Sequence, residues 1–312
     1  MRPGTLRGRD FLSMDDLSVD ELWMVLDLAL DLKKRLKAGE HPRLLEGKSL
    51  AMIFEKPSLR TRVTFEVGMW QLGGTTVYLA PQDVQLGVRE SVADVARNLT
   101  RWVDGIAART FRHTTVEELA EHAEIPVINA LSDLEHPCQV LADLLTIYEK
   151  RRRLEGLRIA WIGDGNNVCH SLLLGAAKLG MHIIVATPEG YAPRGEVVER
   201  AKAHAARSGG HVQLTHDPRE AASGADAIYT DVWASMGQEA EREVRAQVFR
   251  PYQVNRDLVA LAREDVLVMH CLPAHRGEEI TDDVLDGPHS VVLDEAENRL
   301  HAQKALLALL LR

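Results

Sequence analysis

Residues 158–186 read RIAWIGDGNNVCHSLLLGAAKLGMHIIVA and contain two kinds of apolar pattern. The short apolar runs 158–162 and 182–186 have the length and composition of buried strands, whereas segment 171–179 between them is typical of a helix. A strand, a helix and a second strand in this order form the unit from which parallel sheets are built. This stretch therefore predicts an α/β fold.

The same alternation extends over the rest of the chain. Further strands are predicted at 50–54, 75–79, 105–108, 126–130, 212–214, 227–230, 266–269 and 291–292. Further helices are predicted at 18–36 after a capping box of Ser18 and Glu21, and at 65–72, 91–101, 116–123, 140–148, 196–207 and 295–312. The charged segment 151–156 ends in glycine and separates two rounds of this pattern. We therefore predict two domains, 1–150 and 151–294, each with a mainly parallel sheet flanked by helices.

Composition bounds the class of protein. The chain has 312 residues, enough for two domains, with 46% hydrophobic and 27% charged residues, as in globular proteins. A net charge of -9 disfavours a nucleic-acid binder. Three cysteines without paired spacing argue against a disulfide scaffold, and residues 1–10 lack the apolar stretch of a signal peptide. No uncharged apolar run is long enough for a bilayer, so we expect a soluble, cytoplasmic protein without a membrane partner.

The segment FEKPSLRTR, residues 54–62, links a predicted strand to a predicted helix. Ser58 is the expected N-cap, and the N–H groups of a helix start attract phosphate. Thr61 adds a hydroxyl donor, and Arg60 adds a planar guanidinium suited to phosphate. The alternative is a capped helix with solvated arginines.

Other cationic and polar residues follow the next strands of this half. Arg109 ends strand 105–108, where an arginine is often only a surface ion-pair partner. His136 and Gln139 follow strand 126–130 and open a helix. Parallel strands direct their carboxyl ends to one edge of a sheet, so these side chains should meet Arg60 there. Such donors suit a carbonyl oxygen that gains charge in an acyl transfer.

The second half contains a near match to a dinucleotide fingerprint. Gly163 and Gly165 fit the pattern G-x-G-x-x-G, but position 168 is valine and strand 182–186 ends in Thr187 rather than an acidic residue. We interpret the glycines as a tight turn that leaves Asn167 free to bond a ligand, and a dehydrogenase is disfavoured.

Two further loops follow strands of this half. Asp231 precedes Ser235, Met236 and Gly237, and can hold a cationic amine; the alternative is a surface loop with an exposed tryptophan. Cys271 and Leu272 follow strand 266–269. A buried inert thiol is the default for Cys271, but its place beside a polar loop favours a functional role. Arg299 is either a further cationic contact or a solvated helix residue.

Taken together, these motifs resemble the aspartate/ornithine carbamoyltransferase family, and within it the ornithine carbamoyltransferases. The resemblance covers nearly the whole chain and rests on four motifs in order: residues 58–62, 136–139, Asp231 with 235–237, and 270–273. Ornithine enzymes commonly have threonine where this chain has Leu59, and leucine there is familiar from relatives that act on N-acetylated ornithine. The Ser-Met-Gly loop with its upstream Asp231 favours ornithine.

The resemblance implies a reaction, an assembly and a site. The family carbamoylates an amine with carbamoyl phosphate, here L-ornithine to give L-citrulline in arginine biosynthesis, and it forms trimers or larger assemblies of trimers. Its last helix packs back on the first domain, which binds carbamoyl phosphate, while the second domain binds ornithine. The residues that correspond to the carbamoyl phosphate contacts are Ser58, Leu59, Arg60, Thr61, Gln85 from a neighbouring subunit, Arg109, His136, Gln139, Cys271, Leu272 and Arg299. Those that correspond to the ornithine contacts are Asn167, Asp231, Ser235 and Met236.

The chemistry assigns roles to four of these residues. An alkylamine with a pKa of about 10.4 is mostly protonated at neutral pH, so Asp231 and Cys271 are expected to hold it and shape its proton loss. Arg109 and His136 are expected to stabilise the oxyanion. The scheme requires no metal and no organic cofactor. The alternatives are the same chemistry on N-acetylornithine, putrescine or aspartate, and a non-catalytic binding protein.

Overall fold

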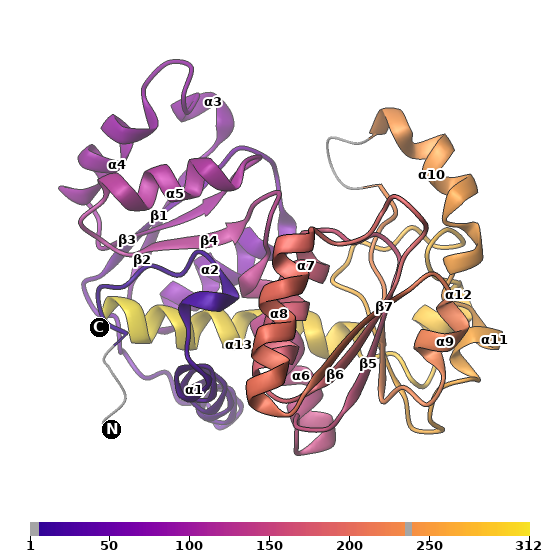
Figure 1. The fold of residues 1–312 in the computed structure, drawn as a ribbon. Helices are drawn as coiled ribbons and strands as arrows, with labels where there is room; N and C mark the ends of the chain where they lie inside the picture. The colour runs from indigo at the N-terminus through magenta and orange to yellow at the C-terminus, as the bar shows by residue number, and fades with distance from the viewer. Residues whose placement is uncertain (1–5, 235–238) are drawn as a thin grey trace. The chain divides into compact units, whose positions relative to one another are not determined.

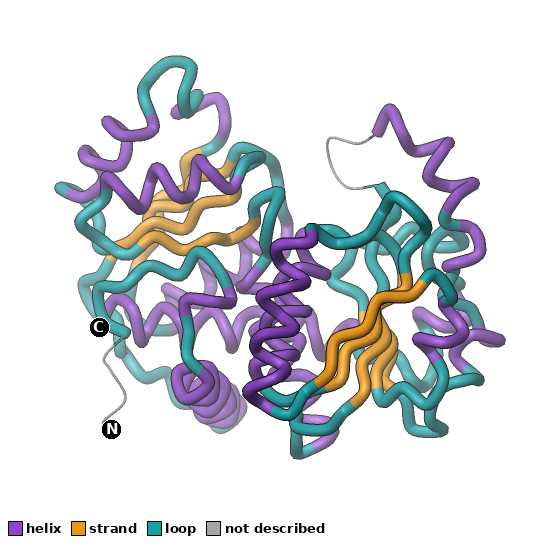
Figure 2. The backbone as a smooth tube through the Cα atoms, in the orientation of Figure 1, coloured by secondary structure: helices purple, strands orange, loops and turns teal. Residues whose placement is uncertain are grey.

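The computed structural model describes residues 6–234 and 239–312 and consists of two compact units. The first unit extends to Leu145 and also includes Glu297–Arg312, and the second is Thr146–Ala296. Each unit contains one sheet whose strands all run parallel, and helices connect them (Figures 1 and 2). The predicted α/β fold with two parallel sheets is confirmed. Within the described residues, no helix is both long and apolar enough to span a membrane.

The sheet of the first unit has the strand order β2-β1-β3-β4. Its strands are β1 (Ser49–Phe54), β2 (Thr75–Leu79), β3 (Gly105–Arg109) and β4 (Val127–Leu131). The helices that begin in this unit are η1 (Met14–Asp16), α1 (Val19–Lys37), α2 (Leu59–Gln71), α3 (Pro81–Val84), α4 (Val92–Thr100), α5 (His113–His122) and α6 (Pro137–Arg151). Buried apolar residues of α4 and α5 pack with alternate residues of β1 and β3, so these two helices cover one face of the sheet (Figure 1).

The sheet of the second unit has the strand order β7-β6-β5-β8-β9. Its strands are β5 (Arg158–Ile162), β6 (His182–Ala186), β7 (His211–Thr215), β8 (Ala227–Tyr229) and β9 (Leu267–Met269). Its helices are α7 (Asn167–Lys178), α8 (Gly195–Ser208), α9 (Pro218–Ala222), η2 (Glu239–Glu241), α10 (Arg242–Val248), η3 (Arg250–Tyr252), α11 (Arg256–Val259), α12 (Asp282–Leu285) and the start of α13 (Val292–Leu311). Buried residues of α9, α11 and α12 share one apolar cluster with β5, β6 and β9.

The terminal helix α13 returns to the first unit, as the resemblance implied. The amide of Gly8 donates to the carbonyl of Leu310 at 2.9 Å, and Lys304 Nζ donates to Gln71 Oε1 at 2.9 Å. A Cβ built on Gly105 in β3 would lie 2.7 Å from a methyl group of Leu311, so the helix approaches the sheet closely at a glycine. The packing of the last helix on the first domain is therefore confirmed.

One predicted strand is wrong. Val292 is the first residue of α13 rather than part of a strand at 291–292. The neighbouring Ser290 makes only an isolated bridge to Val268. Two adjacent β-branched residues favour a strand locally, but the acidic residues Asp294 and Glu295 that follow suit the first turn of a helix.

Candidate active site

Most of the predicted site residues lie at or after the carboxyl ends of strands in both units, whereas Arg299 lies in α13. In the first unit, Ser58 follows β1, Arg109 ends β3 and His136 follows β4. In the second unit, Asp231 follows β8 and Cys271 follows β9. Carboxyl ends of parallel strands gather on one edge of a sheet, where α/β proteins bind ligands. Each unit therefore presents one cluster of candidate side chains.

Helix α2 begins with a capped turn suited to an anion. Ser58 is its N-cap, as predicted, and its Oγ accepts the backbone N–H of Thr61 at 3.3 Å. The first N–H groups of a helix have no partner within it, and the helix dipole makes this end positive. The side chain of Leu59 is 74% exposed, so this residue can offer the turn only its backbone. Arg60 beside it is partly exposed.

Arg299 from α13 is buried and completes this turn. Its Nη1 donates to Gln139 Oε1 at 2.6 Å, and its Nη2 donates to Thr61 Oγ1 at 3.1 Å. The residue is 2% exposed, which excludes the alternative of a solvated helix residue. Gln139 in turn donates through Nε2 to Asp143 at 2.8 Å. The guanidinium therefore fixes both the capped turn of α2 and the first turn of α6.

Arg109 and His136 are buried, so neither is a surface residue. Burial lowers the pKa of His136 well below its usual value, and the neighbouring positive charges of Arg299, Arg109, Lys56 and Arg60 lower it further. The imidazole is therefore neutral at physiological pH and can donate one N–H to a carbonyl oxygen. The same cations attract a phosphate group.

Lys56 belongs to this cluster, although the sequence analysis did not assign it a role. Burial and the charge of Arg109 lower the pKa of Lys56 to about 8. Its Nζ lies 5.1 Å from the centre of the Phe111 ring. An ammonium held in this way loses hydration and gains from an anionic partner. The sequence signal for including Lys56 in this cluster was its place in the loop between β1 and α2.

Asp231 is the centre of the cluster in the second unit. It is buried, and its Oδ2 accepts from Asn166 Nδ2 at 2.7 Å. Its Oδ1 accepts from the thiol of Cys271 at 3.1 Å and from the backbone N–H of Val232 at 2.8 Å. Cys271 is partly exposed and its thiol is hydrogen-bonded to a carboxylate, so it is not an inert core thiol.

Asn166 was missed by the sequence analysis, which singled out Asn167. Asn166 is the N-cap of α7, and its Oδ1 accepts the backbone N–H groups of Val168 and Cys169. This cap leaves its Nδ2 directed to Asp231. Asn167 is the first helical residue and is partly buried. The sequence signal for Asn166 was its position as an N-cap residue before the predicted helix.

The turn before α7 is tight, as the glycines indicated. A Cβ built on Gly165 would lie 2.2 Å from the backbone nitrogen of Pro193, so only glycine fits there. The neighbouring Asp164 pairs with Arg245 of α10 at 3.1 Å. Burial raises the pKa of Asp164 to about 6, although the charge of Arg245 opposes the shift. Arg245 also donates to the carbonyl of Trp233 at 2.8 Å.

Trp233 itself is buried and stacks on Phe249, which contradicts the alternative of an exposed tryptophan in a surface loop. Ser235 and Met236, both predicted to bind the amine substrate, lie outside the described residues. Gln85 is exposed at the C-cap of α3, where its backbone has a φ of 48°. Its position on the surface is compatible with a role in a neighbouring subunit.

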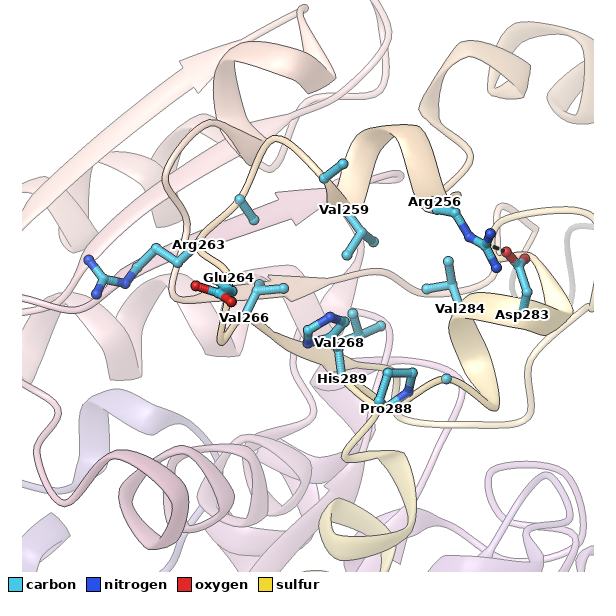
Figure 3. Close-up of a pocket in the computed structure, with 13 residues that line it drawn as sticks. Arg256, Val259, Arg263, Glu264, Val266, Val268, Asp283, Val284, Pro288 and His289 are labelled. Atoms are coloured by element: carbon cyan, nitrogen blue, oxygen red, sulfur yellow. Dashed lines mark ion pairs between the residues drawn. The ribbon is translucent and has the colours of Figure 1, made fainter.

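A separate pocket lies in the second unit, lined by residues of α11, β9, α12 and the loops beside them (Figure 3). Valines of α11, β9 and α12 supply apolar side chains to its lining, and Arg256 and Asp283 form an ion pair of 3.3 Å beside them. Its lining includes Val266 and Val268 but neither Asp231 nor Cys271. The lining therefore includes none of the predicted site residues.

Two family models match this chain. The carbamoyl-P binding domain of the aspartate/ornithine carbamoyltransferases matches residues 9–149, and their Asp/Orn binding domain matches residues 155–310. Both models thus come from the family whose motifs the sequence contains.

Curated proteins and solved structures agree with these matches. An ornithine carbamoyltransferase of Pyrococcus horikoshii is 59% identical, with 98% of this chain and 97% of that protein covered. One of Carboxydothermus hydrogenoformans is 60% identical, with 98% of each covered. The solved ornithine carbamoyltransferase of Pyrococcus furiosus is 57% identical, has a TM-score of 0.97, and covers 99% of this chain and 98% of its own. The chain therefore belongs to the aspartate/ornithine carbamoyltransferase family.

Proposed function

We propose that this protein transfers the carbamoyl group of carbamoyl phosphate to the δ-amine of L-ornithine, giving L-citrulline and phosphate. The observation that carries the proposal is identity of 57–60% over nearly the full chain to enzymes named for this reaction. The first domain, 1–150 with 295–312, binds carbamoyl phosphate, and the second, 151–294, binds ornithine. The names of the two matching family models support this division.

The cations of the first unit suit an acyl phosphate. The N-terminal turn of α2, Arg60 and Lys56 bind the phosphate, and Arg109 bridges the phosphate to the carbonyl oxygen. His136 is held neutral by burial and by its cationic neighbours, so it donates a hydrogen bond rather than a proton. Arg109 and His136 thus stabilise the oxyanion that forms when the carbonyl carbon is attacked. Gln139, fixed by Arg299, binds the carbamoyl amide.

The cluster of the second unit suits an alkylamine. The carboxylate of Asp231 attracts the protonated amine, and the thiol of Cys271 lies beside it. The ammonium first releases one proton to solvent, and the neutral nitrogen then adds to the carbamoyl carbon, which gives the oxyanion. The carbonyl re-forms as the bond from that carbon to the phosphate oxygen breaks. Phosphate leaves with the electron pair of that bond and takes the second proton from the nitrogen. Ser235 and Met236 complete the ornithine site in this proposal, with Asn167.

An assay of citrulline formation at several pH values tests this function. We expect citrulline from ornithine and much slower carbamoylation of N-acetylornithine, putrescine and aspartate. Only the neutral amine attacks, so kcat/KM for ornithine should rise about tenfold per pH unit below the amine pKa of about 10.4. Protonation of His136 should cause no loss of activity near pH 6.5, because the pKa of this residue lies well below that value. Preference for another amine, or a well-folded sample that forms no citrulline, would refute the proposal.

We also propose that the protein forms a trimer through an apolar surface of the first unit. Leu59, Val63 and Trp70 occupy α2 and are 74%, 45% and 71% exposed. The neighbouring β2 is an edge strand, and its Val77 is 47% exposed. Exposed apolar side chains next to an unpaired strand edge are typical of interfaces. An interface on this surface is also consistent with an exposed Gln85 that serves a neighbouring active site.

Sedimentation velocity tests the assembly with two matched tryptophans. Trp70 and Trp102 are both 71% exposed and both belong to the first unit. We expect the wild type and Trp102→Glu to sediment with three times the mass of one chain, or a multiple of it, and Trp70→Glu to dissociate. A monomeric wild type would contradict the trimer, and dissociation by Trp102→Glu alone would place the interface elsewhere.

The cellular setting that we propose is the cytoplasm, with citrulline synthesis as the physiological direction in arginine biosynthesis. None of the three cysteines forms a disulfide, as is usual in a reducing compartment. The relatives from Pyrococcus furiosus and Campylobacter jejuni are named anabolic.

A further inference from the structure

His270, the residue between β9 and Cys271, is held in one orientation and one tautomer. Its Nδ1 accepts the backbone N–H of Leu272 at 2.8 Å, and its Nε2 lies 3.0 Å from Glu279 Oε1. A backbone N–H can only donate, so Nδ1 carries no proton and the proton resides on Nε2, which donates to Glu279. The ring is therefore neutral, and both of its nitrogens are used within the protein.

His270 is also closed to substrates. His270 and Glu279 are each 0% exposed. The backbone N–H of His270 donates to Glu295 Oε2 at 3.1 Å, and Glu295 Oε1 accepts from Tyr229 Oη at 3.0 Å. Backbone and ring are thus fixed by two buried carboxylates. A residue enclosed in this way acts on the reaction only through its neighbours.

The neighbours that His270 controls are Cys271 and Leu272. Leu272 has a φ of 57°, a left-handed conformation that is unfavourable for a residue with a Cβ. The hydrogen bond from its N–H to His270 stabilises this conformation. Cys271 lies between the two residues, and its thiol donates to Asp231 Oδ1 at 3.1 Å. The N–H of Leu272 and the carbonyl of Cys271 belong to one peptide group, so the orientation of this peptide is tied to the backbone that carries the thiol.

We propose that His270 is a positioning residue, held by Glu279, that fixes the Leu272 peptide and thereby the Cys271 thiol against Asp231. Its effect on turnover rests on the proposed function, because Asp231 is the group that holds the amine. Its effect on the thiol does not depend on which substrate the enzyme uses. The two effects can be measured separately.

Two amide variants separate the roles of the two ring nitrogens. His270→Asn places an oxygen near the position of Nδ1 and keeps an acceptor for Leu272, whereas His270→Gln reaches only the position of Nε2. We expect the Asn variant to stay within about tenfold of wild-type kcat and the Gln variant to lose about a hundredfold, as misplaced reacting groups do. The KM for carbamoyl phosphate should change little in both. Equal kcat values, or a more active Gln variant, would overturn the proposal.

Alkylation of Cys271 by iodoacetamide without substrates gives a readout independent of citrulline. Cys138 and Cys169 are buried, so Cys271 should be the thiol that reacts. The Cys271→Ser variant checks this, because its alkylation signal should disappear. We expect the Gln variant to react about tenfold faster than wild type and the Asn variant, because its thiol is released from Asp231. Identical rates in the three proteins would count against the proposal. A faster Gln variant in an enzyme that makes no citrulline would support the positioning role and reject the proposed function.

Substitutions of Glu279 provide the same comparison if the His270 variants do not fold. Glu279→Gln keeps an oxygen that can accept from Nε2, and Glu279→Met has nearly the same length without an acceptor. We expect the Met variant to lose kcat and to alkylate faster, and the Gln variant to resemble wild type. Equal behaviour of these two, each shown to be folded by its thermal unfolding transition, would also overturn the proposal.

Discussion

Replacing Arg109 by glycine is expected to lower kcat by about 10²–10³, the cost of removing one donor to a developing oxyanion. Arg109 is buried at the end of β3, and its charge acts on both His136 and Lys56. Without it, the carbonyl oxygen and the leaving phosphate lose a shared cation. Steady-state citrulline formation at saturating concentrations of both substrates measures the effect.

The matched control is an arginine of the same unit on the surface. The side chain of Arg43 is 64% exposed and pairs with Glu46. Arg43→Gly should retain wild-type turnover, because surface ion pairs contribute little. Both variants should remain folded, as judged by circular dichroism. Wild-type turnover in a folded Arg109→Gly protein would exclude the role that we assign to this guanidinium.

Replacing Asp231 by asparagine is expected to weaken the use of ornithine and to spare carbamoyl phosphate. The buried carboxylate accepts hydrogen bonds from Asn166, Cys271 and Val232. In the proposed site, the negative charge of this carboxylate attracts the amine. Loss of one partner of a buried charge pair costs about 2–5 kcal/mol, so kcat/KM for ornithine should fall about a hundredfold or more. Kinetics with each substrate varied in turn measure the two effects separately.

Asp257→Asn serves as the control for this variant. Asp257 is exposed in the first turn of α11 in the same unit. Its substitution should leave both specificity constants unchanged. If Asp231→Asn instead raised the KM for carbamoyl phosphate and left that for ornithine unaltered, the assignment of the second unit to the amine would be wrong.

Much of the fold could be predicted because local patterns and burial agree. Strands 75–79, 158–162 and 182–186 have the predicted bounds, since each is a short apolar run between helical segments. The capping box at Ser18 and the N-cap at Ser58 could also be predicted from the sequence. Short helices such as α11 and α12 were missed, because four residues provide too few turns for a helical period to show.

The sequence predicted which residues form the candidate site better than it predicted which of them contact one another. Nothing local in the sequence shows that Arg299 meets Thr61 and Gln139, because that contact depends on how α13 packs on the first unit. Lys56 differs from an ordinary surface lysine because it is partly buried. This burial results from the fold and cannot be read from the local sequence. That Asn166 caps α7 and contacts Asp231 depends on the exact residue at which the helix begins, which sequence patterns do not fix.

The origin of Arg299 in α13 has a consequence for the order of folding. The guanidinium that fixes the capped turn of α2 comes from a helix that follows the whole sheet of the second unit in the sequence. A nascent chain can form the sheet of the first unit before α13 is synthesised, but the proposed phosphate site stays incomplete until that helix packs on the unit. Chains that stop short of α13 therefore lack the guanidinium that organises this site.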